Sequence, residues 1–286
     1  MMLDKSSYID QNKSSSVAGE DLQQKINQLE TEKQQLIEQH HQQMKQLEQE
    51  LNDLKSRFIT TVSHEFRTPL TTISFSAGML ENYSNKISDN KKQTHFQRIK
   101  QGIEHMTSLL EDILIVGKLE SGHLEITLTP LNLNVFCRTL VEKMQQKTDK
   151  HSILFSYKGS SDEGVFDENI LRQLINNLLS NAIKYSPAGG EIKFQLICEN
   201  DQAIFKIKDS GIGIPQKDRE RLFTNFYRGT NTSTISGTGL GLSLVKKIVD
   251  LHQGEILIES EENVGTEVQV TLPLKTATLK KFFNCS

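Results

Sequence analysis

Residues 63–70 read Ser-His-Glu-Phe-Arg-Thr-Pro-Leu, inside a segment that is otherwise typical of a long helix. A neutral imidazole is a good nucleophile near pH 7, since its unperturbed pKa is about 6.5. Glu65 is placed to accept a hydrogen bond or a proton from one ring nitrogen of His64 while the other ring nitrogen attacks an electrophile. Pro69 has no amide hydrogen for the carbonyl of Glu65, so we expect a bend one turn after His64. Taken alone, His64 is equally an ordinary exposed residue of a helix.

The chain upstream of this stretch predicts a coiled coil. Residues 1–19 are rich in Ser, Asn, Gln and Lys, and we expect disorder because they cannot bury enough apolar surface. Residues 20–57 lack Pro and Gly, and their apolar spacing has a single stutter near His40. A single surface helix is the alternative, but a polar helix of this length needs a partner, which favours a parallel dimer. The seam positions are Leu22, Ile26, Leu29, Lys33, Leu36, His40, Met44, Leu47, Leu51, Leu54 and Phe58.

The chain downstream of this stretch predicts a helical hairpin over residues 58–120. The first helix should run to about Tyr83, and the polar residues 84–90 should connect it to a second helix ending near Leu119. Two such hairpins from a dimer would form a four-helix bundle. The apolar positions of the second helix recur at three- and four-residue spacing, at Phe96, Ile99, Ile103, Met106, Leu110, Ile113 and Leu114.

Beyond Gly122 the pattern changes to strands that alternate with helices. Residues 124–275 therefore predict an α/β sandwich with a mixed or antiparallel sheet, followed by a tail at 276–286. The fold class is multidomain, an α region followed by an α+β region. Expected strands are 124–128, 153–157, 192–198, 203–208, 255–260 and 267–272, and expected helices are 133–146, 168–185 and 240–252.

The composition argues against nucleic-acid binding and against a membrane segment. A net charge of -3 and a pI near 6.3 leave no basic excess for nucleic acid. Cys137, Cys198 and Cys285 are far apart and predict free thiols in a reducing cytosol. No apolar run approaches the roughly 18 residues of a membrane span, and the first residues are polar. We therefore expect a cytoplasmic chain without a membrane segment.

Three further segments suit a nucleotide. Residues 209–215, Asp-Ser-Gly-Ile-Gly-Ile-Pro, follow an expected strand, and a carboxylate at such a turn can accept a hydrogen bond from an exocyclic amino group. Residues 237–242, Gly-Thr-Gly-Leu-Gly-Leu, open an expected helix whose free N–H groups suit phosphate. Residues 176–185 place Asn177 and Asn181 on one helix face, and amide oxygens suit Mg²⁺. Each segment alone is also compatible with an ordinary turn, helix start or helix.

The stretch around His64 resembles the phosphoacceptor box of two-component sensor histidine kinases. The resemblance implies that His64 is the phosphorylated residue and that Glu65 is its acid/base partner. It further implies that Thr68, four residues on, orients water when the protein dephosphorylates its regulator.

The three later segments resemble the successive boxes of the histidine-kinase ATP-binding domain. Asn181 would then ligate Mg²⁺, and Asp209 would hold the adenine amino group of ATP. Residues 223–228, Phe-Thr-Asn-Phe-Tyr-Arg, resemble the aromatic box of the family, whose basic residue, here Arg228, would reach the γ-phosphate; the composition of residues 228–236 suits a mobile lid over the ligand. Other implied ligand-site residues are Asn177, Lys184 and Tyr185 beside the phosphates and ribose, Gly211 and Gly213 in the adenine pocket, Gly237, Thr238, Gly239, Leu240 and Gly241 around the phosphates, and Thr266 near the adenine.

Together these resemblances imply an ATP- and Mg²⁺-dependent protein histidine kinase. It would phosphorylate itself on His64 and pass the phosphoryl group to an aspartate in the receiver domain of a response regulator. Asn177 stands where hydrolytic relatives carry a glutamate, which favours transfer over hydrolysis. Two alternatives remain open: a regulator-directed phosphatase with minor kinase activity, and a non-catalytic dimeric scaffold.

Overall fold

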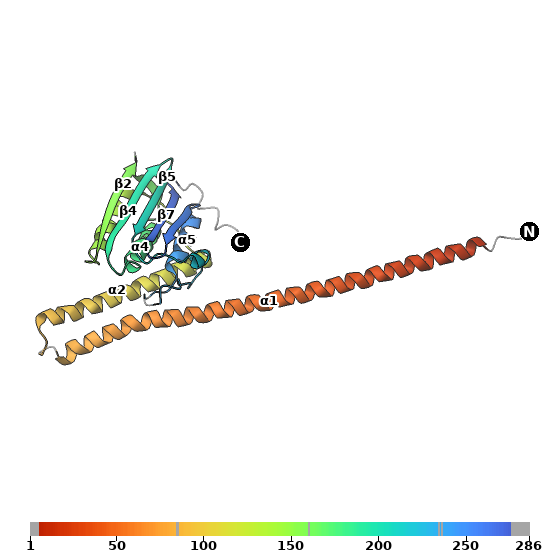
Figure 1. Ribbon diagram of the computed structural model, residues 1–286, viewed down its shortest axis with the longest axis horizontal. Coiled ribbons are helices and arrows are strands. Elements are labelled where there is room, and N and C mark those ends of the chain that lie inside the picture. Colours follow the sequence, from red (N-terminus) through yellow and green to blue (C-terminus); the bar gives the residue numbers. More distant parts are fainter. Residues whose placement is uncertain (1–5, 84–85, 160, 234, 236, 276–286) are drawn as a thin grey trace, which may run out of the picture. The chain divides into compact units, whose positions relative to one another are not determined.

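The computed structural model describes residues 6–83, 86–159, 161–233, 235 and 237–275 (Figure 1). Within these ranges the side chains of 6–24, 26, 27, 54, 57 and 120 are outside the description. The chain divides into two compact units, Met1–Thr60 and Thr61–Ser286. None of the helices in the described ranges combines the length and the apolar character that a membrane span needs.

The first unit consists of the N-terminal part of helix α1 (Ser6–Tyr83). Its described apolar side chains are exposed apart from that of Phe58, which is half-buried; Leu36, for example, is 71% exposed and Leu51 is 64% exposed. Helical structure also replaces the disorder expected for residues 6–19, so that expectation is wrong, while residues 1–5 lie outside the described range. Good helix formers on both sides of this segment favour continuation of one helix.

The second unit begins with the expected hairpin of α1 and α2 (Asp89–Glu120). The helices approach closely at Gly102, where an added Cβ would lie 2.8 Å from the side chain of Ile73. The buried residues of α2 lie at seven-residue spacing, at His95, Gly102, Leu109 and Val116. The neighbouring apolar stripe that the sequence emphasised is partly exposed in the single chain: Phe96, at 57%, Ile103, at 53%, Leu110 and Leu114 are exposed, and Ile99, Met106 and Ile113 are half-buried.

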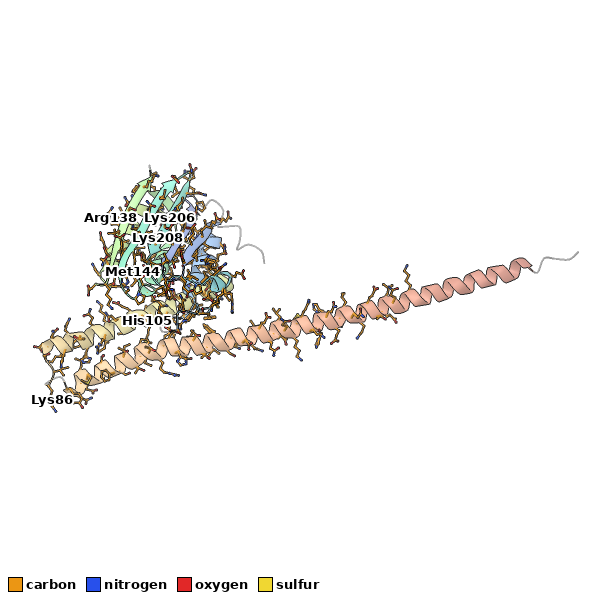
Figure 2. The ribbon with its side chains drawn as sticks, in the orientation of Figure 1. Lys86, His105, Arg138, Met144, Lys206 and Lys208 are labelled. Carbon is orange, nitrogen blue, oxygen red and sulfur yellow. The ribbon has the colours of Figure 1, made fainter. Side chains whose placement is uncertain are left out.

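A five-stranded mixed sheet follows, as expected, in the order β2-β4-β5-β7-β6 (Figure 1). β2 and β4 are parallel, and the remaining pairs are antiparallel. Lys206 and Lys208, labelled in Figure 2, lie on β5. The strands are β2 (His151–Gly159), β4 (Gly190–Glu199), β5 (Gln202–Asp209), β6 (Glu255–Glu261) and β7 (Gly265–Pro273).

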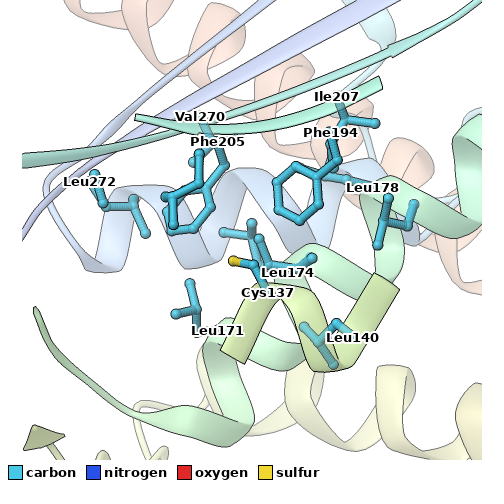
Figure 3. Close-up of a cluster of buried hydrophobic side chains, with 14 of the residues drawn as sticks. Cys137, Leu140, Leu171, Leu174, Leu178, Phe194, Phe205, Ile207, Val270 and Leu272 are labelled. Atoms are coloured by element: carbon cyan, nitrogen blue, oxygen red, sulfur yellow. The ribbon is translucent and has the colours of Figure 1, made fainter. Parts of the chain in front are cut away.

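Helices α3 (Leu133–Gln145), α4 (Glu168–Lys184) and α5 (Gly241–Leu251) supply the other layer of the core. Leu174 and Leu178 of α4 meet Phe194 and Phe205 of the sheet in one apolar cluster (Figure 3). Burial of such side chains contributes roughly 1.5 to 3 kcal/mol each. Val116 of α2 belongs to the same buried cluster, so the end of the hairpin is packed into the α/β core.

A small second sheet corrects the expectation for residues 124–128. These residues are not a strand: Leu124 and Ile126 pack against the core, and the amide of Thr127 donates to Asp167 Oδ2 at 2.8 Å. The strands are instead β1 (Thr129–Asn132) and β3 (Glu163–Phe166), which pair antiparallel. A 3-10 turn, η1 (Gln216–Arg221), was also not expected.

Candidate active site

His64 lies on α1 with its side chain exposed. The hydroxyl of Thr68 donates to the backbone carbonyl of His64 at 3.3 Å, so the two residues are stacked one turn apart on one face. Thr68 is exposed as well. The imidazole and the hydroxyl are therefore both accessible to a macromolecular partner. Helix α1 continues through Pro69, and the expected bend stays a prediction.

Glu65 connects the phosphoacceptor segment to the glycine-rich loop. Its Oε1 accepts a hydrogen bond from the backbone amide of Gly237 at 2.8 Å, and its side chain is only 11% exposed. Its Oε2 lies 3.9 Å from Nε2 of His105 on α2 (Figure 2). This carboxylate thus contacts the loop and His105, while the acid/base role toward His64 stays a prediction.

The predicted residues of α4 face the glycine-rich loop. Asp167 caps α4 by accepting from the amides of Asn169 and Ile170 at 2.9 and 3.1 Å, which fixes the start of the helix and hence its helical phase. A Cβ on Gly241 would lie 2.8 Å from Oδ1 of Asn177 and 3.6 Å from Nδ2 of Asn181. Both asparagine amides therefore lie against the first residue of α5.

Lys184 and Tyr185 extend the same face. Nζ of Lys184 donates to the hydroxyl of Tyr185 at 3.3 Å and lies 4.8 Å from its ring centroid. The ammonium also lies so close to Gly237, whose φ is +152°, that a side chain there would collide with it. A cation beside a glycine-rich helix start is a favourable setting for an anionic phosphate.

The glycine-rich loop leads directly into α5. The hydroxyl of Thr238 accepts from the amide of Leu240 at 3.2 Å, and the Leu240 side chain is buried. The carbonyl of Gly239, whose φ is +73°, accepts from the amide of Phe226 at 3.1 Å. The buried side chain of Leu240 thus anchors the loop, and only the backbone of Leu240 can take the ligand role that the sequence predicted.

Asp209 ends β5 at the other side of the site. The side chain is 8% exposed, and its Oδ1 accepts from the amides of Gly211 at 2.9 Å and Thr266 at 3.3 Å. Burial raises the pKa of this carboxyl, and the two backbone hydrogen bonds partly offset the rise. Both of these hydrogen bonds go to Oδ1, so Oδ2 can accept from a ligand.

The turn after Asp209 needs its glycines. A Cβ on Gly211 would collide with the carbonyl oxygen of Tyr185, and one on Gly213, whose φ is +62°, would collide with that of Glu261. The amide of Ile212 donates to the carbonyl of Tyr185 at 2.9 Å. The turn is therefore pressed against the end of α4, which brings Asp209 and the α4 residues into one site.

The segment expected to form a lid is held by a residue that the sequence did not single out, Asp218 of η1. This carboxylate is 1% exposed and accepts from the hydroxyl of Tyr227 at 2.7 Å and from the amide and hydroxyl of Thr230 at 2.8 and 3.0 Å. Burial opposes its ionisation, but these hydrogen bonds outweigh burial and hold the pKa of Asp218 below its ordinary value. In a charged run, such an aspartate gives no sequence signal.

Arg228 is occupied by its own loop. Its guanidinium donates to the carbonyl of Thr232 at 2.8 Å and to that of Ile235. Both bonds use one nitrogen, Nη2, and the predicted contact of this side chain with a γ-phosphate stays a prediction.

Asp112 on α2 is the second residue that the sequence did not single out. Its carboxylate accepts from Nε2 of Gln173 and from Nδ2 of Asn177, the latter at 3.4 Å. Burial raises the pKa of Asp112, and the hydrogen bonds from Asn177 and Gln173 oppose the rise. The sequence does carry a signal for this residue: Asp112 lies three residues after Leu109 and four before Val116, so it places a charge on the buried stripe of an amphipathic helix.

The fold and the site define a nucleotide-binding protein with an attached phosphoacceptor hairpin. Residues 166–276 match the family of histidine kinase-, DNA gyrase B- and HSP90-like ATPases, and residues 54–122 match the His Kinase A (phospho-acceptor) domain. The chain belongs to the two-component sensor histidine kinases.

Individual relatives agree with this assignment. Sensor histidine kinase WalK of Bacillus subtilis is 34% identical over 80% of the chain, and adaptive-response sensory kinase SasA of a Synechocystis strain is 34% identical over 77%. The chain spans 38% and 59% of the lengths of these two relatives. A solved structure of full-length ShkA in complex with AMPPNP has a TM-score of 0.54 at 27% identity and covers 76% of this chain and 46% of that one.

Proposed function

We propose that the chain is an ATP-dependent protein histidine kinase that phosphorylates itself on His64 and passes the phosphoryl group to an aspartate of a response-regulator receiver domain. The observation that carries the proposal is the hydrogen bond between Glu65, next to His64, and the amide of Gly237 in the glycine-rich loop. It joins the phosphoacceptor segment to the loop that would hold the phosphates.

The donor set fits ATP. Oδ2 of Asp209 would accept from the adenine amino group, and Lys184 with the amides at the start of α5 would bind the phosphates. A relative, ShkA, was solved in complex with AMPPNP. The site therefore supplies an acceptor at one end and donors at the other, as an adenine nucleotide requires.

The residues also fit Mg²⁺. Asn181, and the amide oxygen of Asn177 beside it, are hard neutral donors of the kind that Mg²⁺ accepts alongside phosphate oxygens and water. Bound there, Mg²⁺ would neutralise charge on the phosphates of ATP. No carboxylate or imidazole cluster of metal-binding type occurs in the described part of the chain, so the asparagines are the proposed ligands.

In the proposed reaction, a ring nitrogen of neutral His64 attacks the γ-phosphorus, and the bond from that phosphorus to the leaving oxygen of ADP breaks. Glu65 would hold or remove the proton on the other ring nitrogen after leaving Gly237. The phosphohistidine then gives its phosphoryl group to the carboxylate of the regulator. The exposure of His64 suits both steps.

We also propose a homodimer. The hairpin leaves large apolar side chains exposed on both helices, among them Phe75 at 59%, Phe96 at 57% and Ile103 at 53%. A second hairpin would cover them in a four-helix bundle, and the apolar stripe of residues 20–57 would continue the contact as a coiled coil. The domains proposed are a coiled coil at 20–57, a dimerisation and phosphotransfer domain at 58–120 and an ATP-binding domain at 124–275.

A second activity, dephosphorylation of the regulator, is supported by one observation. The hydroxyl of Thr68 is exposed one turn from His64, where it could orient water toward a phosphoaspartate on a docked receiver domain.

The kinase proposal is tested by incubating the purified chain with Mg²⁺ and γ-labelled ATP. We expect label on the protein that is stable to base, labile to acid and absent from His64→Gln, and that is strongly reduced in Asn181→Ala. Label that survives loss of His64, or that resists acid, would contradict the proposal. Transfer from the labelled chain to candidate receiver domains then identifies the partner.

A further inference from the structure

The starting point is the orientation of the Asn177 side chain. Its Nδ2 donates to the backbone carbonyl of Gln173 at 3.0 Å and to Oδ1 of Asp112 at 3.4 Å. Its Oδ1 points the other way, because this atom would lie 2.8 Å from a Cβ on Gly241. The amide therefore presents oxygen, and not nitrogen, to the start of α5.

Asp112 has the chemistry to enforce that orientation. An ionised carboxylate only accepts hydrogen bonds, so it pairs with the NH₂ group of Asn177 and would repel the carbonyl oxygen. The bond to the carbonyl of Gln173 is the shorter of the two but is neutral, and Asp112 adds a charged acceptor at 3.4 Å that attracts the NH₂ group. Asp112 is itself held in place by Nε2 of Gln173, and its helix is packed into the α/β core through Val116.

We propose that Asp112 is a positioning residue for the phosphoryl-transfer site: it fixes the amide of Asn177 so that an oxygen faces the glycine-rich loop. This inference rests on the proposed ATP and Mg²⁺ site. An oxygen at that place can accept from a metal-bound water or contact the cation, whereas an NH₂ group can do neither. Because Asp112 belongs to the phosphoacceptor hairpin, the hairpin itself contributes a determinant of the nucleotide site.

A merely structural role must be separated from this one, since Asp112 could serve only to attach α2 to α4. A structural attachment predicts a general loss of stability and of nucleotide binding. A positioning role predicts a loss confined to Mg²⁺-dependent binding, and it predicts that the effect passes through Asn177.

The first measurement is direct. Side-chain amide signals of asparagine are recorded by NMR in the full chain, and that of Asn177 is assigned from its absence in Asn177→Ala. In Asp112→Ala we expect its hydrogen exchange to accelerate on the order of tenfold, as loss of a charge-assisted bond implies. The matched control is Glu111→Ala, which removes an exposed carboxylate from the neighbouring position. Equal exchange in the two variants would overturn the proposal.

The second measurement is binding of a non-hydrolysable ATP analogue by calorimetry as Mg²⁺ is varied. Mg²⁺ should increase the affinity for the ATP analogue, and in Asp112→Ala we expect the Mg²⁺ concentration that gives half of this increase to rise roughly tenfold. The affinity for the analogue without Mg²⁺ should change by less than about twofold. Asp112→Asn, whose Oδ1 can still accept, should lie between this variant and the wild type. An equal loss of metal-free binding would overturn the proposal.

A double-mutant cycle with Asn177→Ala completes the test. If Asp112 acts through Asn177, then Asp112→Ala changes the Mg²⁺ dependence by less than about twofold in that background, whereas independent effects would multiply. Should Asp112→Ala fold poorly in a thermal melt, Asp112→Asn carries the same comparison. Absence of label on wild-type His64 would refute the kinase proposal, whereas the exchange and binding measurements judge Asp112 without any phosphoryl transfer.

Discussion

Asp209→Asn should change the preference of the site from an adenine nucleotide to an inosine nucleotide without damaging the fold. The substitution keeps the shape of the side chain, and an amide oxygen can replace Oδ1 as the acceptor for the amides of Gly211 and Thr266. The atom in place of Oδ2 then becomes an NH₂ group. This NH₂ group would face the adenine amino group, and two hydrogen-bond donors cannot pair.

The magnitude follows from these contacts. The variant loses a charge-assisted hydrogen bond to the base, worth about 1.5 to 3 kcal/mol, and leaves a donor unpaired at a further cost of about 1 to 3 kcal/mol. A total of about 2.5 to 6 kcal/mol weakens the binding of an ATP analogue on the order of 10²- to 10⁴-fold. An inosine nucleotide, which carries a carbonyl where adenine carries the amino group, should instead gain affinity, because the new NH₂ group donates to that carbonyl whereas the carboxylate oxygen repels it.

Stability should change in the opposite direction. Burial raises the pKa of Asp209 in the folded state above its value in the unfolded chain. Ionisation of this carboxyl therefore destabilises the folded state. The penalty is full above the folded-state pKa, decreases as the pH falls below it and is gone below the unfolded-state pKa. The neutral variant should therefore unfold at an equal or higher temperature near pH 7. This difference should shrink on acidification.

Calorimetry with the adenine and inosine nucleotides, together with thermal unfolding of both proteins, checks the reasoning. Adenine binding within about threefold of the wild type would refute the assigned role of Oδ2. A large fall in melting temperature would instead show that the carboxylate is needed for the fold, and the binding loss would then carry no information about the base.

Three other expectations concern the surrounding framework. Gly213→Ala should destabilise by about 2 to 4 kcal/mol, since its Cβ would meet the carbonyl of Glu261, whereas Gly190→Ala, with positive φ but no atom within 4 Å of its Cβ, should cost only about 1 kcal/mol in denaturant melts. Burial lowers the pKa of His252, so the unfolded chain binds more protons below about pH 6.5 and stability falls on acidification; His252→Phe should flatten the loss in melts between about pH 7 and pH 5. Asp218→Ala should increase hydrogen exchange of lid amides roughly tenfold or more, while Asp218→Asn retains part of the protection.

The hairpin and most of the sheet were predictable because their patterns are local. Apolar positions at three- and four-residue spacing predicted a first helix to about Tyr83 and a second helix after a connection at residues 84–90, and in the structure α1 ends at Tyr83 and α2 begins slightly earlier than expected, at Asp89. The strands β4 and β5 alternate buried residues with more exposed ones, and the expected positions of β4, β5 and β7 are confirmed.

The second small sheet was not predictable in the same way. β1 and β3 are four residues long, and Thr129 pairs with Phe166, far away in the sequence. The alternating run at 124–128 looked more like a strand than either of them, but its apolar residues are buried by packing and its backbone binds the Asp167 cap. A short apolar alternation reports which side chains are buried and does not specify a strand partner.

In the candidate site, too, features that depend on neighbouring residues were predictable, whereas contacts between distant segments were not. The glycines and the asparagine face of α4 were visible in the sequence because backbone conformation and helical phase depend on neighbours in the chain. The partners of Glu65, Asp112 and Asp218 were not visible, since each carboxylate is satisfied by donors from a different segment.

These long-range carboxylate contacts have a mechanistic implication. Glu65 holds the amide of Gly237, an amide that is proposed to bind phosphate, while Asp112 holds the NH₂ of Asn177, a group that the phosphates do not need. A triphosphate would therefore displace Glu65 and free it to serve His64, yet it could leave Asp112 in place. On this reasoning, nucleotide binding itself makes the acid/base partner available at the phosphoacceptor, whereas the contact between α2 and α4 persists and keeps Asn177 oriented through the transfer.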